Sequence, residues 1–150
     1  MKNRAKNINS QSAYFKAITK LENSGIRATR QRKILTKLIF ENGNNHFTAE
    51  ALFKKVNNLN YKISLATIYN TLKNFSNYGM LREIVVDQNK SIYCTNHEPH
   101  YHLYIEDEEK IVDIPNEYFD LSKISEIPAC LKLHNIDIIV RVRTVKDIIN

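Results

Sequence analysis

The stretch Ser64-Leu-Ala-Thr-Ile-Tyr-Asn-Thr-Leu-Lys-Asn-Phe75 decides the fold of the first half of this chain. Ser64 can cap a helix that we expect to end at Gly79. Its apolar residues recur at helical spacing: Leu65, Ile68, Leu72 and Phe75. The face that we expect to point outward is polar: Thr67, Asn70, Thr71 and Asn74. Short polar side chains of this kind approach base edges in the major groove of DNA, so the stretch predicts a recognition helix.

The residues on either side of this stretch complete a known arrangement. Two helices are expected before it, capped by Thr29 and Thr48, and a shorter one over residues 13–21. After Gly79, residues 81–94 hold two β-branched runs around a polar turn, which is typical of a hairpin. Helices, a recognition helix and a hairpin follow one another in the order of a winged helix-turn-helix.

The second half is predicted to be rich in strands. Residues 101–105, 111–114 and 135–143 have strand patterns, and residues 115–130 have room for a short helix. So small a sheet needs a partner surface, which favours dimerisation. We therefore expect an α+β protein, with a winged-helix DNA-binding domain over 1–96 and a small α/β dimerisation and ligand-sensing domain over 97–150. Residues 1–11 are predicted to be a flexible basic arm.

Charge divides the chain at the same place. Residues 1–96 carry 16 Lys and Arg against 5 Asp and Glu, whereas residues 97–150 carry 6 against 11. The asymmetry favours a basic module that meets a polyanion such as double-stranded DNA. Two solvated surfaces of opposite sign are the alternative.

Several protein classes are not supported. No apolar run approaches the roughly 18 residues that span a bilayer, and the start has no apolar signal segment, so we expect a cytoplasmic protein without a membrane partner. The two cysteines, Cys94 and Cys130, form no C-x-x-C pair, which disfavours a four-cysteine zinc site or a disulfide framework. Gly-rich phosphate loops and G-x-S-x-G or H-E-x-x-H motifs are missing, so we expect no enzyme.

The candidate DNA-binding residues divide by the part of DNA that they suit. Asn70 and Asn74 suit adenine and the threonine methyl groups suit thymine, which predicts an A·T-rich target; a merely solvated helix is the alternative. The expected phosphate contacts are Arg32, Lys62, Tyr69, Lys73 and Lys90. Ser64 completes the set at the start of the helix.

Histidines indicate a metal site in the second half. His100 and His102 are two residues apart on a predicted strand, so both imidazoles leave the same face. That is ligand-pair geometry for zinc, iron or manganese, and Cys94, Glu98 and Asp113 are near enough in the sequence or the hairpin to add donors. Two surface histidines placed by chance are the alternative.

These motifs together resemble the ferric uptake regulator family over about residues 20–143. The resemblance is carried by Gly25-Ile-Arg-Ala-Thr29-Arg-Gln-Arg32, His46-Phe-Thr-Ala-Glu50, the stretch from Ser64 to Leu72, Lys90-Ser-Ile-Tyr93 and His100-Tyr-His102. Within the family the chain looks most like the iron response regulator branch, which senses haem. Thr29-Arg-Gln-Arg32, Asn70 and Asp113-Ile-Pro115 favour that branch.

The resemblance implies a homodimer that binds inverted repeats and a hinge metal site for Fe, Mn or Zn. The family's ligand positions fall here on His46, Cys94, His100, His102 and Asp113. Cys94 departs from the family's carboxylate, and a thiolate favours a softer metal or haem. His100 and His102 are the haem candidates.

A second family site falls on residues that flank the histidine pair. Its positions here are Pro99, Tyr101, Asp120 and His134, and Pro99 cannot bind a metal.

The functional hypothesis is a regulator of iron or haem homeostasis. Metal or haem at the hinge would set the angle between the two halves, and with it the spacing of two recognition helices in a dimer. The alternatives are a peroxide- or other metal-sensing repressor of the same family, a metal-binding protein without specific DNA binding, and a metal-dependent hydrolase.

Overall fold

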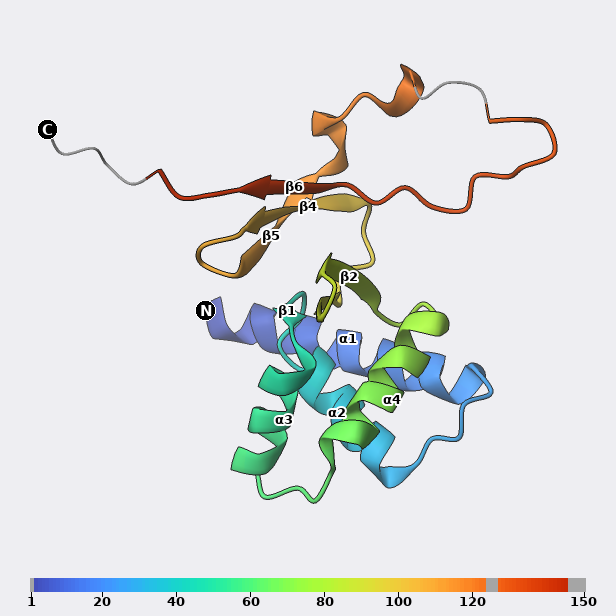
Figure 1. The fold of residues 1–150 in the computed structure, drawn as a ribbon. Helices are drawn as coiled ribbons and strands as arrows, with labels where there is room; N and C mark the ends of the chain where they lie inside the picture. The colour runs from blue at the N-terminus through green and yellow to red at the C-terminus, as the bar shows by residue number, and fades with distance from the viewer. Residues whose placement is uncertain (1, 124–126, 146–150) are drawn as a thin grey trace, which may run out of the picture. The chain divides into compact units, whose positions relative to one another are not determined.

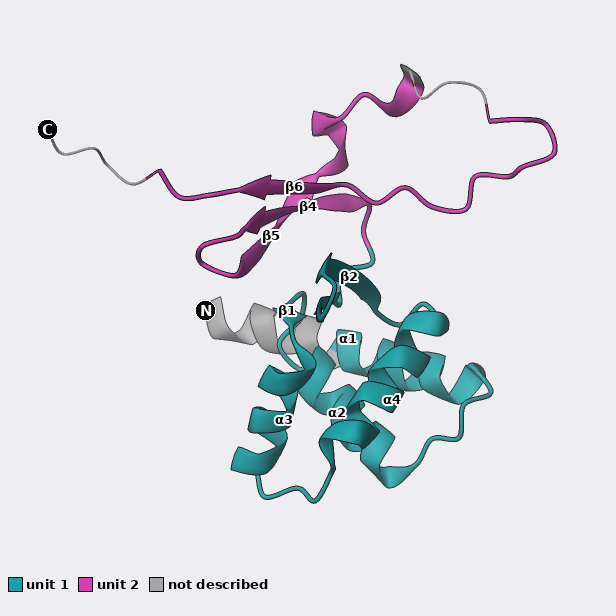
Figure 2. Ribbon diagram, in the orientation of Figure 1, with its two compact units in different colours: residues 1–97 teal, residues 98–150 magenta. Residues whose placement is uncertain are grey.

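In the computed structural model the chain separates into two units, residues 1–97 and 98–150 (Figure 2). The structure describes the backbone of residues 2–123 and 127–145, and side chains from residue 12 onward apart from that of Lys123. The division between the units lies one residue from the domain boundary that we predicted. Both helices and strands are present, in agreement with the expected α+β class.

Unit 1 contains four helices (Figure 1). They are α1 (Lys2–Asn23), α2 (Arg30–Phe40), α3 (Ala49–Asn58) and α4 (Leu65–Asn77). Thr29, Thr48 and Ser64 each accept a hydrogen bond from the backbone N–H three residues further on, which satisfies a donor at the start of a helix. The three predicted caps are therefore confirmed.

Helix α1 includes most of the segment 1–11, for which we expected a flexible basic arm, and its flexibility stays a prediction. Its backbone is helical from Lys2, and the first glycine and proline of the chain come only at Gly25 and Pro99, so the sequence offers no strong helix breaker in this stretch. The side chains of residues 1–11 lie outside the described residues. Any contact of theirs with DNA stays a prediction.

The core of unit 1 is formed by the inner faces of these helices. The residues that are at most 1% exposed include Leu21, Leu35, Ile39, Val56, Ile68, Leu72 and Phe75. The α4 members are those predicted from helical spacing, except that Leu65 is only half-buried. This packing fixes α4 along its apolar face and leaves its outer face to solvent.

A three-stranded antiparallel sheet completes unit 1. It contains β1 (His46–Phe47), β2 (Arg82–Asp87) and β3 (Lys90–Cys94) in the order β1-β3-β2. The predicted hairpin is β2 and β3, with a register shift between Val85 and Asp87. Strand β1 was not predicted, because two residues are too few to show an alternating pattern.

Unit 2 is built on a second three-stranded sheet. It contains β4 (His100–Ile105), β5 (Lys110–Pro115) and β6 (Ile139–Val142) in the order β5-β4-β6, with β6 parallel to β4. Two short 3₁₀ turns, Asn116–Tyr118 and Leu121–Lys123, stand where a short helix was predicted. Strand β6 is shorter than the predicted 135–143, because only residues 139–142 pair with β4.

Within the described part of the chain, no helix is both long and apolar enough to cross a membrane.

Candidate metal centre and nucleic-acid interface

Three side chains of unit 2 converge on one point of its sheet. His100 and His102 leave the same face of β4, and their Nε2 atoms are 3.0 Å apart. Asp113 on β5 is paired with His102 on β4. Its Oδ1 atom lies 3.4 Å from Nε2 of His100 and 3.5 Å from Nε2 of His102. Two nitrogens bound tetrahedrally to one zinc ion would be about 3.3 Å apart, given the usual Zn–N length. The three donor atoms thus have the spacing of ligands around a single ion.

A backbone contact orients the first of these histidines. The Nδ1 atom of His100 is 2.6 Å from the carbonyl oxygen of Glu98. A carbonyl can only accept, so Nδ1 carries the proton and donates it, which leaves a lone pair on Nε2 for a metal. Glu98, predicted as a donor through its position in the sequence, contributes this carbonyl contact.

Unit 1 brings together the other two predicted ligands. The register of β1 against β3 places His46 opposite Cys94, and their ligand atoms lie within 4.8 Å of each other. Thr95 anchors the neighbouring turn, since its hydroxyl accepts from the Asn45 backbone N–H at 2.9 Å. Phe47 stacks on Tyr93 with ring centroids 5.8 Å apart. The otherwise unpredicted strand β1 therefore creates this pair.

The donor types fit a transition-metal ion better than haem. Imidazole, carboxylate and thiolate donors suit zinc, iron and manganese. Haem iron bound to His100 or His102 would need open space for the porphyrin beside the imidazole. Both histidines are buried and their Nε2 atoms face each other, so the predicted haem ligation does not fit this geometry.

The second family site is not assembled in the described residues. Tyr101 packs edge-on against Phe119, and the Asp120 carboxylate accepts from the backbone and hydroxyl of Ser122. These bonds lower the pKa of Asp120. His134 is exposed, and no cluster of three metal-binding groups includes Asp120 or His134 in the part of the chain that the structure describes.

The predicted DNA-binding residues on helix α4 differ in their exposure to solvent. Asn70 and Lys73 are exposed, and Thr67 and Asn74 are half-buried. Thr71 is only 2% exposed, which corrects its prediction as a reading residue. The reason is helical geometry: position 71 is three residues from Ile68 and four from Phe75, so it belongs to the inner stripe.

The other predicted DNA contacts differ in their exposure and in the hydrogen bonds that they make within the protein. Lys62 and Tyr69 are exposed, whereas Lys90 and Arg32 are half-buried. Arg32 donates to the Arg27 carbonyl at 2.8 Å, and Ser64 caps α4. Lys62 and Lys73 thus remain the more accessible cations for phosphate.

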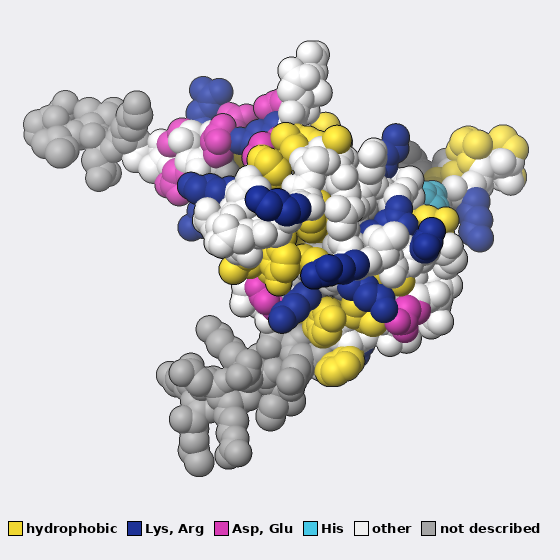
Figure 3. All heavy atoms as spheres, turned by 90° about the horizontal axis from the view of Figure 1, so that it is seen from below, with side chains coloured by type: hydrophobic (Ala, Val, Ile, Leu, Met, Phe, Trp, Pro, Cys, Tyr) yellow, Lys and Arg dark blue, Asp and Glu magenta, His cyan; other side chains and the backbone are white. Residues whose placement is uncertain are grey.

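Basic side chains gather on one face of unit 1. Figure 3 views the molecule from below the orientation of Figure 1, onto α2, α3 and the turn before α4. Lys and Arg cross the middle of this face with apolar side chains between them, and acidic side chains are few. Such a surface suits a phosphate backbone.

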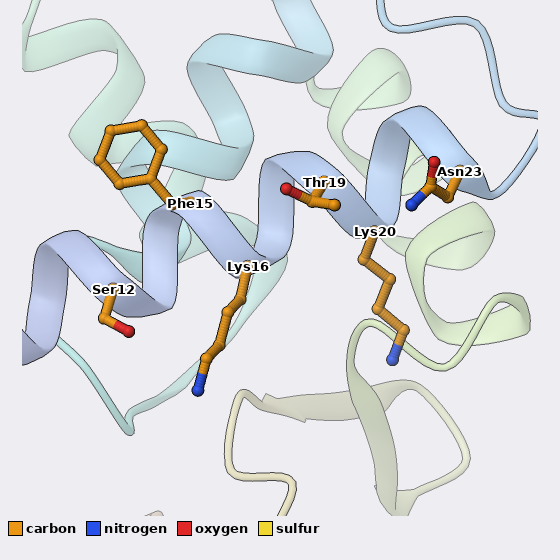
Figure 4. A pocket seen from close by; sticks show the side chains of 6 residues that line it. All are labelled: Ser12, Phe15, Lys16, Thr19, Lys20 and Asn23. Atoms are coloured by element: carbon orange, nitrogen blue, oxygen red, sulfur yellow. The ribbon is translucent and has the colours of Figure 1, made fainter.

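A hollow lies along α1. It is lined by Ser12, Phe15, Lys16, Thr19, Lys20 and Asn23 (Figure 4). Lys20 donates from Nζ to the Gly79 carbonyl at 2.6 Å, which ties α1 to the end of α4.

Comparison with known proteins identifies the family. Residues 23–140, most of the chain, match the model of the ferric uptake regulator family. The chain belongs to the ferric uptake regulator family. Membership makes it a transcription regulator rather than an enzyme.

Individual relatives agree with this assignment. The peroxide-responsive repressor PerR of Staphylococcus saprophyticus is 32% identical over 111 residues, which cover 74% of this chain and 73% of the repressor. The Vibrio cholerae ferric uptake regulator shares the fold with a TM-score of 0.69 at 24% identity, over 83% of this chain and 96% of that one. The Pseudomonas aeruginosa regulator, solved with manganese, gives 0.67 at 18% identity, over 85% and 97%. A relative from Staphylococcus aureus strain Mu50, also 32% identical over 111 residues, is likewise named a peroxide-responsive repressor.

Glu50 contacts a predicted DNA-binding residue, and the sequence analysis did not predict that contact. Its carboxylate accepts a hydrogen bond from the Tyr69 hydroxyl, which joins α3 to the outer face of α4. An acid within a strongly basic half was the only signal in the sequence, and it did not indicate a contact across 19 positions.

Proposed function

We propose that this chain is a metal-dependent, peroxide-responsive repressor that binds A·T-rich inverted-repeat DNA as a homodimer in the cytoplasm. The observation that carries the proposal is the convergence of His100, His102 and Asp113, with three donor atoms 3.0–3.5 Å apart. Its similarity to PerR repressors supports the peroxide response. A haem-responsive regulator has less support, because the histidine pair does not suit haem.

The proposed ion is shared between the two units. His46 and Cys94 supply donors from unit 1, and only five residues separate Cys94 from His100 in the sequence. An ion bound by both sets would limit the orientations that the units adopt. Such an ion favours one arrangement of the units over others, which is how a ligand shifts a conformational equilibrium.

DNA reading is assigned to α4. Asn70 and Asn74 offer amides for adenine, Thr67 offers a methyl group, and Lys62 and Lys73 offer charge for phosphate. Two such helices in a dimer would meet half-sites spaced by the helical repeat of DNA. Restricting the angle between the units would then control whether both α4 helices of the dimer can bind their half-sites at the same time.

The test is peroxide release from a defined duplex. Full-length protein loaded with Fe²⁺ or with Zn²⁺ is titrated onto an A·T-rich inverted repeat, and hydrogen peroxide is then added. Zinc has no redox chemistry, so we expect peroxide to release the iron-loaded protein and to leave the zinc-loaded protein bound. Release of neither form, with tight binding throughout, would contradict the peroxide response and leave a plain metal-dependent repressor.

A further inference from the structure

Glu50 is an acidic side chain beside the proposed reading helix. It lies in the first turn of α3, and its carboxylate accepts from the hydroxyl of Tyr69 in the second turn of α4. Tyr69 is still 43% exposed, so the bond lies at the surface and does not hold the ring in the core. A carboxylate on a surface that meets DNA is repelled by phosphate, so its presence calls for a compensating role.

The hydrogen bond between Tyr69 and Glu50 affects the protonation of both side chains. The hydrogen bond from Tyr69 is the largest effect that lowers the pKa of Glu50, and the charge of Lys90 on β3 also lowers it. The same bond raises the pKa of Tyr69. Glu50 is therefore ionised at neutral pH, and Tyr69 keeps its proton and directs it at Glu50.

This arrangement limits what Tyr69 can offer to another molecule. A phenol has a single O–H donor, and Glu50 takes it. A phosphate oxygen accepts hydrogen bonds but cannot donate them, so Tyr69 loses its means of binding phosphate. The ring and the hydroxyl lone pairs remain, and these suit an apolar methyl group or an amino group.

Neighbouring residues place the pair where α3, α4 and β3 meet. Burial, and then the charges of Glu83, Tyr69 and Glu50, raise the pKa of Tyr93 on β3 to about 12. Tyr93 is itself held by stacking on Phe47. The hydrogen bond to Glu50 is the contact that directs the Tyr69 hydroxyl toward α3.

We propose that Glu50 is a positioning and specificity-determining residue for DNA recognition. It holds Tyr69 away from phosphate and directs the ring toward base edges, where the thymine methyl group or an exocyclic amino group of adenine or cytosine is recognised. This reassigns Tyr69 from the phosphate contacts expected from the sequence. The inference rests on the proposed function, because it needs α4 in the major groove.

The experiment measures preference for the thymine methyl group. Full-length protein with Mn²⁺ is titrated onto an A·T-rich inverted repeat and onto the same duplex with deoxyuridine in place of thymidine, which removes the methyls and leaves the phosphates. The variants are Glu50→Ala, Glu50→Gln, Tyr69→Phe and the double variant Glu50→Ala/Tyr69→Phe. Glu22→Ala is the control, because it removes an exposed carboxylate from α1 with the same change in charge.

We expect Glu50→Ala and Tyr69→Phe each to reduce the preference for thymidine by about fivefold or more, a fold-change that corresponds to a lost base contact. Glu50→Gln keeps an acceptor oxygen and should keep the preference, as should Glu22→Ala. The double variant should be no worse than either single variant, because both remove one interaction.

Two results would overturn the inference. In the first, Glu50→Ala tightens binding to both duplexes as much as Glu22→Ala does, with an unchanged preference, so that only charge matters. In the second, the losses of thymidine preference in the two single variants add up in the double variant. If the wild type itself binds no duplex, the proposed function fails, and the role of Glu50 fails with it.

Discussion

Single residues on α4 differ in role according to their helical position. Asn70 is exposed, whereas its neighbour Thr71 is 2% exposed. We expect Asn70→Ala to weaken binding to the A·T-rich duplex by about 1–3 kcal/mol without changing the melting temperature. Thr71→Ala should instead lower the free energy of unfolding by about 1 kcal/mol and leave the affinity unchanged. Fluorescence anisotropy and thermal melts measure the two effects, and exchanged effects would contradict this assignment.

At this scale the sequence predicted what depends on local spacing. The caps Thr29, Thr48 and Ser64 and the shared face of His100 and His102 follow from positions a few residues apart. The same spacing, applied to the whole inner stripe, would have placed Thr71 inside. The Glu50–Tyr69 contact depends on how α3 packs beside α4, which no local pattern contains.

Among the elements, the end of α4 depends on one glycine. Gly79 has a φ of +67°, and its carbonyl accepts from Lys20. Gly79→Ala should lower the free energy of unfolding by about 1 kcal/mol, because an L side chain is strained there.

Ser76, three residues earlier, provides an opposite control. Its buried hydroxyl has no hydrogen-bond partner among the described residues, so Ser76→Ala should raise the free energy of unfolding by about 0.5–1 kcal/mol. Chemical denaturation measures both variants. Equal effects of the same sign would contradict this account of the helix end.

The acidic turn after β4 holds the end of β6. The Thr144 backbone N–H donates to Asp107 at 2.9 Å, and Arg143 donates to Glu106 at 2.8 Å. The bond from the Thr144 backbone is the main cause that lowers the pKa of Asp107 below its ordinary 3.8. A lowered pKa means that the contact is present above pH 3.8 and is lost as the pH falls through the folded value.

We therefore expect the NMR shift of the Thr144 amide proton to titrate below pH 3.8. In Asp107→Asn that titration should disappear. An unchanged titration in the variant would show that another group is responsible.

Among the strands, β1 marks the limit of the sequence patterns. β4, β5 and the hairpin were predicted because each is a strand-like run beside a polar turn, whereas β1 exists only through pairing with β3. That pairing is long-range in the sequence, from position 46 to position 94. The expectation that His46 and Cys94 serve one metal site came from the family resemblance, not from periodicity.

For the whole molecule, the account requires ligands from both units. His102→Ala should lower the affinity for Mn²⁺ or Zn²⁺ by about tenfold or more, since it removes one of few donors. His46→Ala should also lower it if the ion is shared, and His134→Ala, an exposed histidine, should not. Competition with a chromogenic chelator measures each affinity. An unchanged affinity in His46→Ala would restrict the site to unit 2.

The most direct test of the central claim is anisotropy on the A·T-rich inverted repeat, with and without Mn²⁺, for the wild type and His102→Ala. We expect Mn²⁺ to tighten binding of the wild type by about tenfold or more and to have little effect on the variant, a coupling of ordinary size for two linked sites. An equal gain in both proteins would contradict the claim that the cluster of His100, His102 and Asp113 controls DNA binding.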